Sequence, residues 1–373
     1  MQEDYQEGRA WIEINLDNLE YNVEQIKKQI SDKTKIMAVV KANAYGHGDI
    51  LIAKKLNEIG IHDFAVATLE EGIHLRENNI QGNILILGYT SPKAIKKIIE
   101  NDLTQALVDE EYSKQIQKEN HTKIPLKVHI KINTGMNRIG FSSKDITALE
   151  KVFQIPEIQV TGMFSHLAVA DDENEEAKKF TKQQMQELQD CVDALKQTGN
   201  DVGKIHIQSS YGIFAENHNS YDYIRTGIFL YGITEKKDFY LKPVLSLKAK
   251  VESIHMIQKG ETVGYGRSYT AQKEEKIAAV SIGYADGYPR GLSNQGTKVL
   301  IHGKYAEIVG KICMDQLMIN VSNLKDVKVG DIVTFIGKDS DKEIHVNELA
   351  KKAGTISYEI LARLGQRLPR IAK

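Results

Sequence analysis

The chain has 373 residues, of which 49 are Lys or Arg and 50 are Asp or Glu, so its formal net charge is −1. This balance gives no electrostatic reason to expect a nucleic acid or an anionic membrane as a partner. Two cysteines, Cys191 and Cys313, are too few for a disulfide scaffold, and no apolar run approaches the ~18 residues that cross a bilayer. We therefore expect a cytoplasmic protein, and its length predicts two domains.

Short apolar segments alternate with helix-like segments over the first two thirds of the chain. They are rich in Val and Ile and do not alternate strictly with polar residues, which is typical of strands covered on both faces. We expect eight strands, at residues 35–41, 63–68, 83–88, 104–109, 126–133, 159–167, 204–210 and 223–232. The clearest helix spans residues 174–196, where apolar side chains recur at three- and four-residue steps.

Eight strand–helix units within the usual ~250 residues predict an α/β fold with an N-terminal (β/α)8 TIM-like barrel. A doubly wound open sheet is the alternative, but no GxGxxG sequence follows the first strand. The polar residues 234–238 mark a boundary, so we expect the barrel at 1–238 and a C-terminal, mainly β domain at 239–373. A first strand near residues 8–15 could belong to the barrel or join the β domain. The expected strands of the second domain are 244–251, 277–282, 298–301 and 331–336.

Polar side chains gather at the ends of the predicted barrel strands, where barrel enzymes hold their active sites. Lys41 ends an apolar strand, so we expect its amine to be partly desolvated, with a lowered pKa and raised reactivity toward carbonyls. A lysine that extends into solvent is the alternative. The other strand ends contribute Lys131, Arg138, His166, His206, Ser209, Ser210, Arg225, Gly227 and Ile228.

The seventh and eighth strands are followed by Ser209-Ser210 and Gly227-Ile228, at the position where barrels often bind a phosphate group. Hydroxyl groups and exposed backbone N–H groups suit a phosphate, although Ser and Gly are also common in ordinary turns. A reactive lysine on the first strand and a phosphate site on the last two together predict pyridoxal 5′-phosphate as the cofactor.

Nearly the whole chain, from Arg9 to Ile371, resembles the alanine racemase family. The segment VVKANAYGHG around Lys41 is similar to the family's cofactor-lysine signature. Further family segments occur in the expected order: KINTGMNRIGF, FSHLAVAD, YIRTGIFLYG, VGYGRSYTA, VSIGYADGYPR, GKICMDQLMI and ISYEILARLGQRLPRI. The resemblance implies a pyridoxal-phosphate racemase built from a barrel and a β domain.

The resemblance also implies a role for each matched position. Lys41 holds the cofactor and acts as one of two bases, and Tyr265 is the second base, which reaches the active site of the other subunit of a homodimer. Arg225 contacts the pyridine nitrogen with His206 behind it, and His166 lies beside the ring. The implied cofactor-phosphate ligands are Tyr45, Ser210, Gly227, Ile228 and Tyr358, with Ser209 next to them.

Four further positions are implied to act around the substrate. Arg138 contacts the cofactor's phenolic oxygen and the substrate, supported by Lys131, which is often carbamylated in relatives. Met314 and Asp315 resemble contributions from the partner subunit to the substrate-carboxylate end.

The substrate stays open between serine and alanine. Ser209-Ser210-Tyr211 stands where relatives that use alanine usually have Asn-Ser followed by small residues. The chain is also similar to the cytoplasmic catalytic domain of membrane-anchored serine racemases of the vancomycin-resistance type. With either substrate, the resemblance implies a supply of D-amino acids for peptidoglycan precursors.

Other readings of a pyridoxal-phosphate barrel are a plain housekeeping alanine racemase, a basic amino-acid decarboxylase and a non-catalytic carrier of the cofactor. A decarboxylase is expected to have an acid in place of Arg225. Seven other histidines show no metal-ligand spacing, and we expect no catalytic metal: His62, His74, His121, His218, His255, His302 and His345.

Overall fold

The computed structural model describes residues 8–215 and 221–373, so His218 lies outside the described residues. The chain divides into two compact units. The barrel unit contains residues 20–44 and 49–230, and the β-rich unit combines the residues up to 19 with 45–48 and 231–373. These ranges differ from the expected 1–238 and 239–373 because the N-terminal strand pairs with C-terminal strands and the segment 45–48 packs with them.

The barrel unit is a ring of eight parallel strands, which confirms the predicted fold class. Each strand pairs with the next one around the ring, and Tyr223 of the last strand lies opposite Lys35 of the first, so the ring is closed. The ring strands are β2 (Lys35–Val39), β3 (Asp63–Val66), β4 (Asn83–Ile86), β5 (Thr104–Leu107), β6 (Leu126–Asn133), β8 (Ile158–Phe164), β9 (Lys204–His206) and β10 (Tyr223–Thr226). A short strand, β7 (Phe141–Ser142), pairs with β6 outside the ring.

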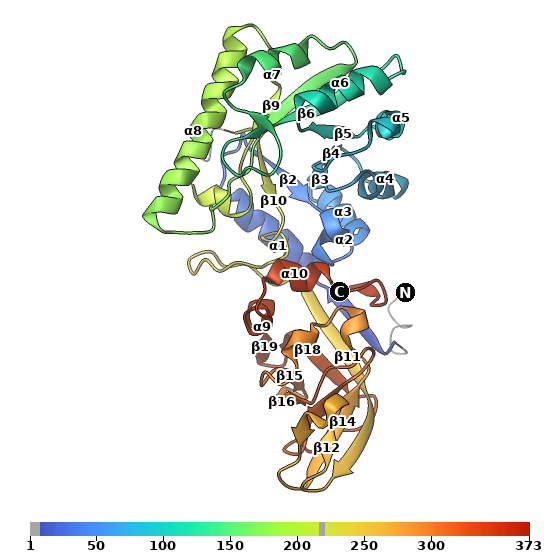
Figure 1. Cartoon of the computed structure of the whole chain (residues 1–373). Helices are drawn as coiled ribbons and strands as arrows, with labels where there is room; N and C mark the ends of the chain where they lie inside the picture. Colours follow the sequence, from blue (N-terminus) through green and yellow to red (C-terminus); the bar gives the residue numbers. More distant parts are fainter. Residues whose placement is uncertain (1–7, 216–220) are drawn as a thin grey trace. The chain divides into compact units, whose positions relative to one another are not determined.

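Helices follow the strands and lie around the ring (Figure 1). The longest, α8 (Glu175–Gln197), begins where the Asn174 side chain accepts a hydrogen bond from the Ala177 N–H at 2.8 Å. Its Leu188 and Val192 side chains are fully buried on one face, as the apolar spacing predicts. The others are α1 (Leu16–Lys27), α2 (Lys41–Tyr45), α3 (Asp49–Glu58), α4 (Leu69–Glu77), α5 (Ile95–Glu100), α6 (Glu110–Glu119) and α7 (Ile146–Phe153).

The β-rich unit is mainly β, as predicted. Its central strand, β11 (Leu245–Ile257), pairs with three others, β1, β14 and β18, so the sheet curves back on itself. Two short helices, α9 (Val346–Ala353) and α10 (Ser357–Ala362), complete the unit. The other strands are β1 (Ala10–Ile14), β12 (Thr262–Val263), β13 (Tyr269–Thr270), β14 (Glu275–Val280), β15 (Lys298–Ile301), β16 (Lys304–Val309), β17 (Leu317–Asn320), β18 (Ile332–Asp339), β19 (Lys342–Ile344) and β20 (Arg370–Ala372).

Seven of the eight barrel strands end earlier than predicted, and β6 alone ends at the predicted residue. Among the shortened strands, β2 ends at Val39, β9 at His206 and β10 at Thr226. After β9, the Ser210 hydroxyl accepts a hydrogen bond from the Gly227 N–H at 3.2 Å, and a 3-10 turn, η3 (Tyr211–Phe214), begins. Side-chain bonds of this kind replace the regular ladder between strands. The chain beyond each shortened strand is therefore loop, and these loops carry most of the predicted site residues.

A buried carboxylate stabilises the turn that follows β14. Asp286 is fully buried, accepts the Gly283 N–H at 3.0 Å and pairs with the Arg9 guanidinium at 2.5 Å. Asp286→Ala is expected to lower the free energy of unfolding by about 2 kcal/mol, since the partly exposed Arg9 loses its buried partner. Denaturant unfolding measures this loss. Lys338→Ala, which removes an exposed ion pair with Glu343, is the control and should change stability by less than about 0.5 kcal/mol; equal losses in both variants would contradict the assignment.

Candidate active site

Lys41 lies two residues beyond β2, at the start of a left-handed turn. Residues 42–45 have φ values between 51° and 53°, a conformation that costs roughly 1–2 kcal/mol per residue for side chains with a Cβ. The turn is held by Glu71, whose Oε1 accepts the Ala42 N–H at 2.7 Å, and by Asn43, whose Oδ1 accepts the Asp49 N–H at 2.9 Å. Backbone strain that is stabilised by specific contacts is typical of functional sites.

The electrostatic surroundings of Lys41 lower its pKa. Burial is the largest cause, followed by the positive charges of Arg138 and Arg225, whereas Glu71 acts in the opposite direction. Lys131 is 3% exposed, and burial together with the same two arginines lowers its pKa to about 7. Four basic side chains therefore influence one another at this end of the barrel, and the neutral form of Lys131 becomes accessible near neutral pH.

Arg225 is the centre of a buried hydrogen-bond network. Its guanidinium donates to His206 Nδ1 at 2.6 Å, to His166 Nδ1 at 3.1 Å and to the Ser165 carbonyl oxygen at 2.6 Å. A guanidinium has no acceptor, so both imidazoles must present an unprotonated Nδ1. Burial and the neighbouring cations lower the pKa of His166 to about 2, which keeps this ring neutral.

The ends of β9 and β10 lie side by side. The Ser210 hydroxyl lies 3.1 Å from the Thr226 hydroxyl and accepts the Gly227 N–H. The Ser209 carbonyl accepts the Gly212 N–H at 3.0 Å, and the Ile228 side chain is buried. Hydroxyl and backbone N–H groups thus gather at the place where the sequence predicts a phosphate group.

Two tyrosines of the predicted site come together within the β-rich unit. The Tyr45 ring lies 5.9 Å from the Tyr358 ring and 5.2 Å from the buried Tyr231 ring, between ring centroids. Burial raises the pKa of Tyr45 to about 12, so its hydroxyl stays protonated and can donate a hydrogen bond.

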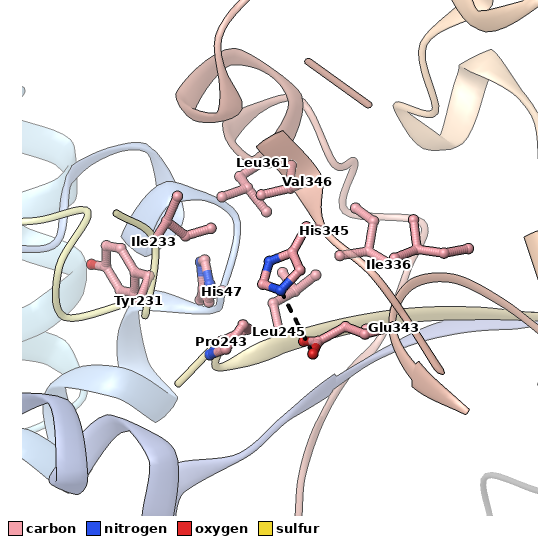
Figure 2. A pocket seen from close by; sticks show the side chains of 12 residues that line it. His47, Tyr231, Ile233, Pro243, Leu245, Ile336, Glu343, His345, Val346 and Leu361 are labelled. Carbon is pink, nitrogen blue, oxygen red and sulfur yellow. Dashed lines mark ion pairs between the residues drawn. The ribbon is translucent and has the colours of Figure 1, made fainter. Parts of the chain in front are cut away.

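Tyr231 also supports His47, whose ring stacks on it at 4.3 Å (Figure 2). Beyond His47, a small cavity is lined mainly by apolar side chains, with the ion pair of His345 Nε2 and Glu343 Oε2 at 3.6 Å on its wall. The cavity has room for about one water molecule, so it is too small for an amino acid. We therefore regard it as part of the support behind Tyr45.

The remaining predicted residues of the β-rich unit are at its surface. Tyr265 is 70% exposed on the 3-10 turn η5 (Tyr265–Arg267), and glycines with positive φ, Gly264 and Gly266, flank it. Met314 is 54% exposed between β16 and β17, and the neighbouring Asp315 accepts a hydrogen bond from Arg367 at 2.7 Å. A tyrosine this exposed is available to another molecule.

The barrel unit thus brings together Lys41, Lys131, Arg138, His166, His206, Ser209, Ser210, Arg225, Gly227 and Ile228, and the β-rich unit holds Tyr45, Tyr265, Met314, Asp315 and Tyr358. Two residues near the site were not predicted. Glu71 is recognisable from the sequence as part of a helix capping box with Thr68, but its bond to the Lys41 turn is not. His129 lies inside β6, and its sequence position carries no distinguishing signal.

Within residues 8–215 and 221–373, no three His, Cys, Asp or Glu side chains gather as a metal site would require. In the same part of the chain, no helix combines the length and apolar character needed to cross a membrane. Both cysteines are free, and Cys191 is buried.

Comparisons with known proteins agree over both units. The family profile of the alanine racemase N-terminal domain matches residues 14–235, and that of the alanine racemase C-terminal domain matches residues 244–372. An alanine racemase of Carboxydothermus hydrogenoformans is 39% identical over 97% of this chain and 99% of its own length. An amino-acid racemase of Enterococcus faecalis is 43% identical over 96% of this chain, but the chain spans only 51% of that relative. Among solved structures, the alanine racemase of Bacillus anthracis with bound L-Ala-P has a TM-score of 0.92 and 35% identity, covering 98% of this chain and 95% of that one.

Proposed function

Since this chain belongs to the alanine racemase family and is an amino-acid racemase, we propose that it interconverts the L and D forms of alanine, serine or both with two bases, Lys41 and Tyr265. The observation that carries the proposal is the partly buried Lys41 amine, whose pKa is lowered beside Arg138 and Arg225 at the end of a closed barrel. Such an amine is suited both to hold a carbonyl compound and to take a proton.

The cofactor is pyridoxal 5′-phosphate, as in the rest of the family, and the residues of the barrel unit fit it. Bound pyridoxal 5′-phosphate supplies an electron sink that makes the substrate Cα–H acidic. Lys41 would hold its aldehyde carbon, and the Ser210 hydroxyl would donate to its phosphate group. The Gly227 N–H, which donates to the Ser210 oxygen in this structure, would exchange that bond for one to the phosphate group. The charges of Arg138 and Arg225, which lower the pKa values of Lys41 and Lys131, favour a ligand with several negative charges.

The phosphate site has further proposed members. Ser209 and Ile228 lie next to Ser210 and Gly227 in the same loops. The protonated hydroxyl of Tyr45 and that of its neighbour Tyr358 are suitable donors to a phosphate oxygen. Arg138 makes no ion pair or hydrogen bond with the residues that the structure describes, so its guanidinium remains available for the cofactor's phenolic oxygen and the substrate carboxylate.

Arg225 is proposed to face the pyridine nitrogen, with His206 and His166 holding its guanidinium in place. Because an arginine does not give up its proton, it leaves that nitrogen unprotonated and keeps the electron density of the broken Cα–H bond close to Cα. The proton then returns to Cα, as racemisation requires. This arrangement disfavours a decarboxylase, for which we expect an acid at this position.

Arg225→Glu is expected to lower kcat/KM for racemisation by about 100-fold and to raise cofactor loss as the pyridoxamine form by about tenfold per turnover. A carboxylic acid at this position would share a proton with the ring nitrogen, which draws electron density from Cα into the ring. Chiral chromatography of the amino acid and the cofactor spectrum measure the two quantities. Arg225→Lys keeps a cation and serves as the control. An unchanged ratio of cofactor loss to racemisation in Arg225→Glu would refute the role of Arg225.

Lys131 is proposed to be carbamylated. Its pKa of about 7 leaves a large neutral fraction at neutral pH, and the neutral amine attacks CO2, forming a C–N bond and releasing a proton. The carbamate anion that results is stabilised by the positive charges of Arg138 and Arg225. Mass spectrometry after alkyl trapping in bicarbonate should find the modification on Lys131 but not on Lys127, an exposed lysine of the same strand that pairs with Asp102. Equal labelling of the two lysines would argue against a specific site.

Members of the family act on small amino acids and are typically dimeric. We infer that the active sites of this protein are shared in a homodimer, with Tyr265, Met314 and Asp315 serving the barrel of the partner subunit. The large exposure of Tyr265 supports this inference, since a catalytic phenol must be buried against a substrate when it acts. Each site then has Lys41 on one face of the substrate Cα and Tyr265 on the other. We also infer a cytoplasmic location and a supply of D-amino acids for peptidoglycan precursors.

The proposal is tested by racemisation kinetics on L-alanine and L-serine with one purified sample. We expect turnover of at least one of them and a modest preference, because methyl and hydroxymethyl side chains differ by one hydroxyl group. Ser209 and Tyr211 are the candidate determinants. Tyr211 packs edge-on against Phe229 at 4.8 Å, which fixes a bulky ring beside the proposed phosphate site. Inertness toward both amino acids would overturn the proposal.

A further inference from the structure

A second histidine continues the network that begins at Arg225. His206 Nε2 lies 2.8 Å from His129 Nδ1, so three buried side chains form a line: Arg225, His206 and His129. Their exposed fractions are 4%, 0% and 7%. The line runs through the barrel interior, from β10 through β9 to β6.

The direction of every hydrogen bond in this line is determined by its first member. Arg225 only donates, so His206 Nδ1 accepts and the neutral His206 ring carries its proton on Nε2. That proton is donated to His129 Nδ1, so His129 also carries its own proton on Nε2. Burial and the charge of Arg225 lower the pKa of His129 to about 4 and that of His206 well below its usual value, in agreement with two neutral rings.

The neighbouring strand leaves a space that fits the His129 ring. Gly162 of β8 pairs in register with His129, and a Cβ at Gly162 would lie 2.8 Å from two carbons of the imidazole and 2.7 Å from the Lys204 carbonyl oxygen of β9. A side chain at this position would therefore press on both the ring and the neighbouring strand. On its other side, His206 stacks on Phe164 with the ring planes 9° apart. The geometry therefore fixes both rings.

We propose that His129 is a positioning residue: by accepting the Nε2 proton of His206, it holds the His206 ring with Nδ1 toward Arg225 and so fixes the guanidinium for the pyridine nitrogen. The proposal rests on the proposed function, in which Arg225 faces that nitrogen. Without an acceptor at position 129, the buried Nε2–H of His206 has no partner in the line, and the ring is expected to rotate or to admit water, which releases Arg225.

The test compares His129→Leu, which removes the acceptor, with His129→Asn, whose Oδ1 can stand in for Nδ1. In His129→Leu, we expect the partition between cofactor loss and racemisation to rise about tenfold, as one buried hydrogen bond is worth about that factor. His129→Asn should restore the partition to near the wild-type value. A residue that merely stabilises the fold would change the melting temperature and leave the partition unchanged.

A second measurement does not depend on turnover. In 15N-histidine-labelled protein, with and without cofactor, His206 should give a slowly exchanging Nε2–H signal that His129→Leu loses and His129→Asn keeps. A wild-type partition together with an unchanged His206 signal in His129→Leu would overturn the proposal. Wild-type protein that racemises neither alanine nor serine would overturn the proposed function instead, and the His206 signal would still decide whether His129 holds the ring.

Discussion

Replacing Lys41 with alanine is expected to lower kcat/KM for racemisation by about 10⁴-fold or more, because the variant loses the amine that we propose both to hold the cofactor and to act as one of the two bases. Borohydride reduction should no longer fix the cofactor to the chain. The measurements are racemisation kinetics and the intact mass of the reduced protein. Lys35→Ala is the matched control, since Lys35 is an exposed lysine at the opposite end of the same strand, and it should behave as wild type.

The outcome depends on how firmly the chain fixes position 41. The left-handed turn and its hydrogen bonds with Glu71 and Asp49 place one lysine side chain at the start of the turn. Lys131 is the other lysine whose pKa is lowered by the same arginines, but it is 3% exposed and its Nζ already donates to the Ile132 carbonyl at 2.7 Å. Covalent fixation that persists in Lys41→Ala would place the attachment on another lysine and refute the proposed role.

The barrel could be predicted because each of its strands and helices has a hydrophobic pattern that can be recognised within a short segment. Strands covered on both faces need continuous apolar residues, and α8 needs one apolar stripe, so each pattern reports its own burial. The turn after Lys41 could not be predicted in this way. Alanine is the best helix former, yet Ala42 and Ala44 adopt the left-handed conformation together with Asn43. Hydrogen bonds with Glu71, which is distant in sequence, and with Asp49, which begins the next helix, stabilise this conformation.

The candidate site was predictable where strand ends carry polar side chains. Lys41, His206 and Arg225 stand out because each interrupts or follows an apolar run. His129 did not, because it alternates with apolar residues inside β6, and only the pairing of β6 with β8 and the position of His206 give it a role. The domain limits could also be predicted only in part from the sequence, because β1 and β20 come from opposite ends of the chain and pair in parallel in one sheet.

Replacing Tyr265 with phenylalanine is expected to lower racemisation by about 10³-fold while leaving cofactor fixation on Lys41 intact. The ring is kept and the hydroxyl that we propose as the second base is lost, so the proton on one face of Cα would have no base. In D2O, one enantiomer should still exchange its Cα hydrogen through Lys41 without inversion, whereas the other should stop exchanging. Tyr305→Phe is the matched control, an exposed tyrosine of the same unit that lies beside Lys298 and Lys342. Equal exchange of both enantiomers in Tyr265→Phe would mean that another group serves this face.

Mixing the two inactive variants tests whether the site is shared between subunits. A mixed dimer of Lys41→Ala and Tyr265→Phe contains one site with both defects and one site with neither, if each site takes Lys41 from one subunit and Tyr265 from the other. Random exchange gives half mixed dimers, so about a quarter of the wild-type activity should return. If both bases came from the same subunit, every site would carry one defect and no activity would return despite exchange. Mass spectrometry of the intact dimers establishes that exchange has occurred, so the recovered fraction distinguishes a shared site from one built within a single chain.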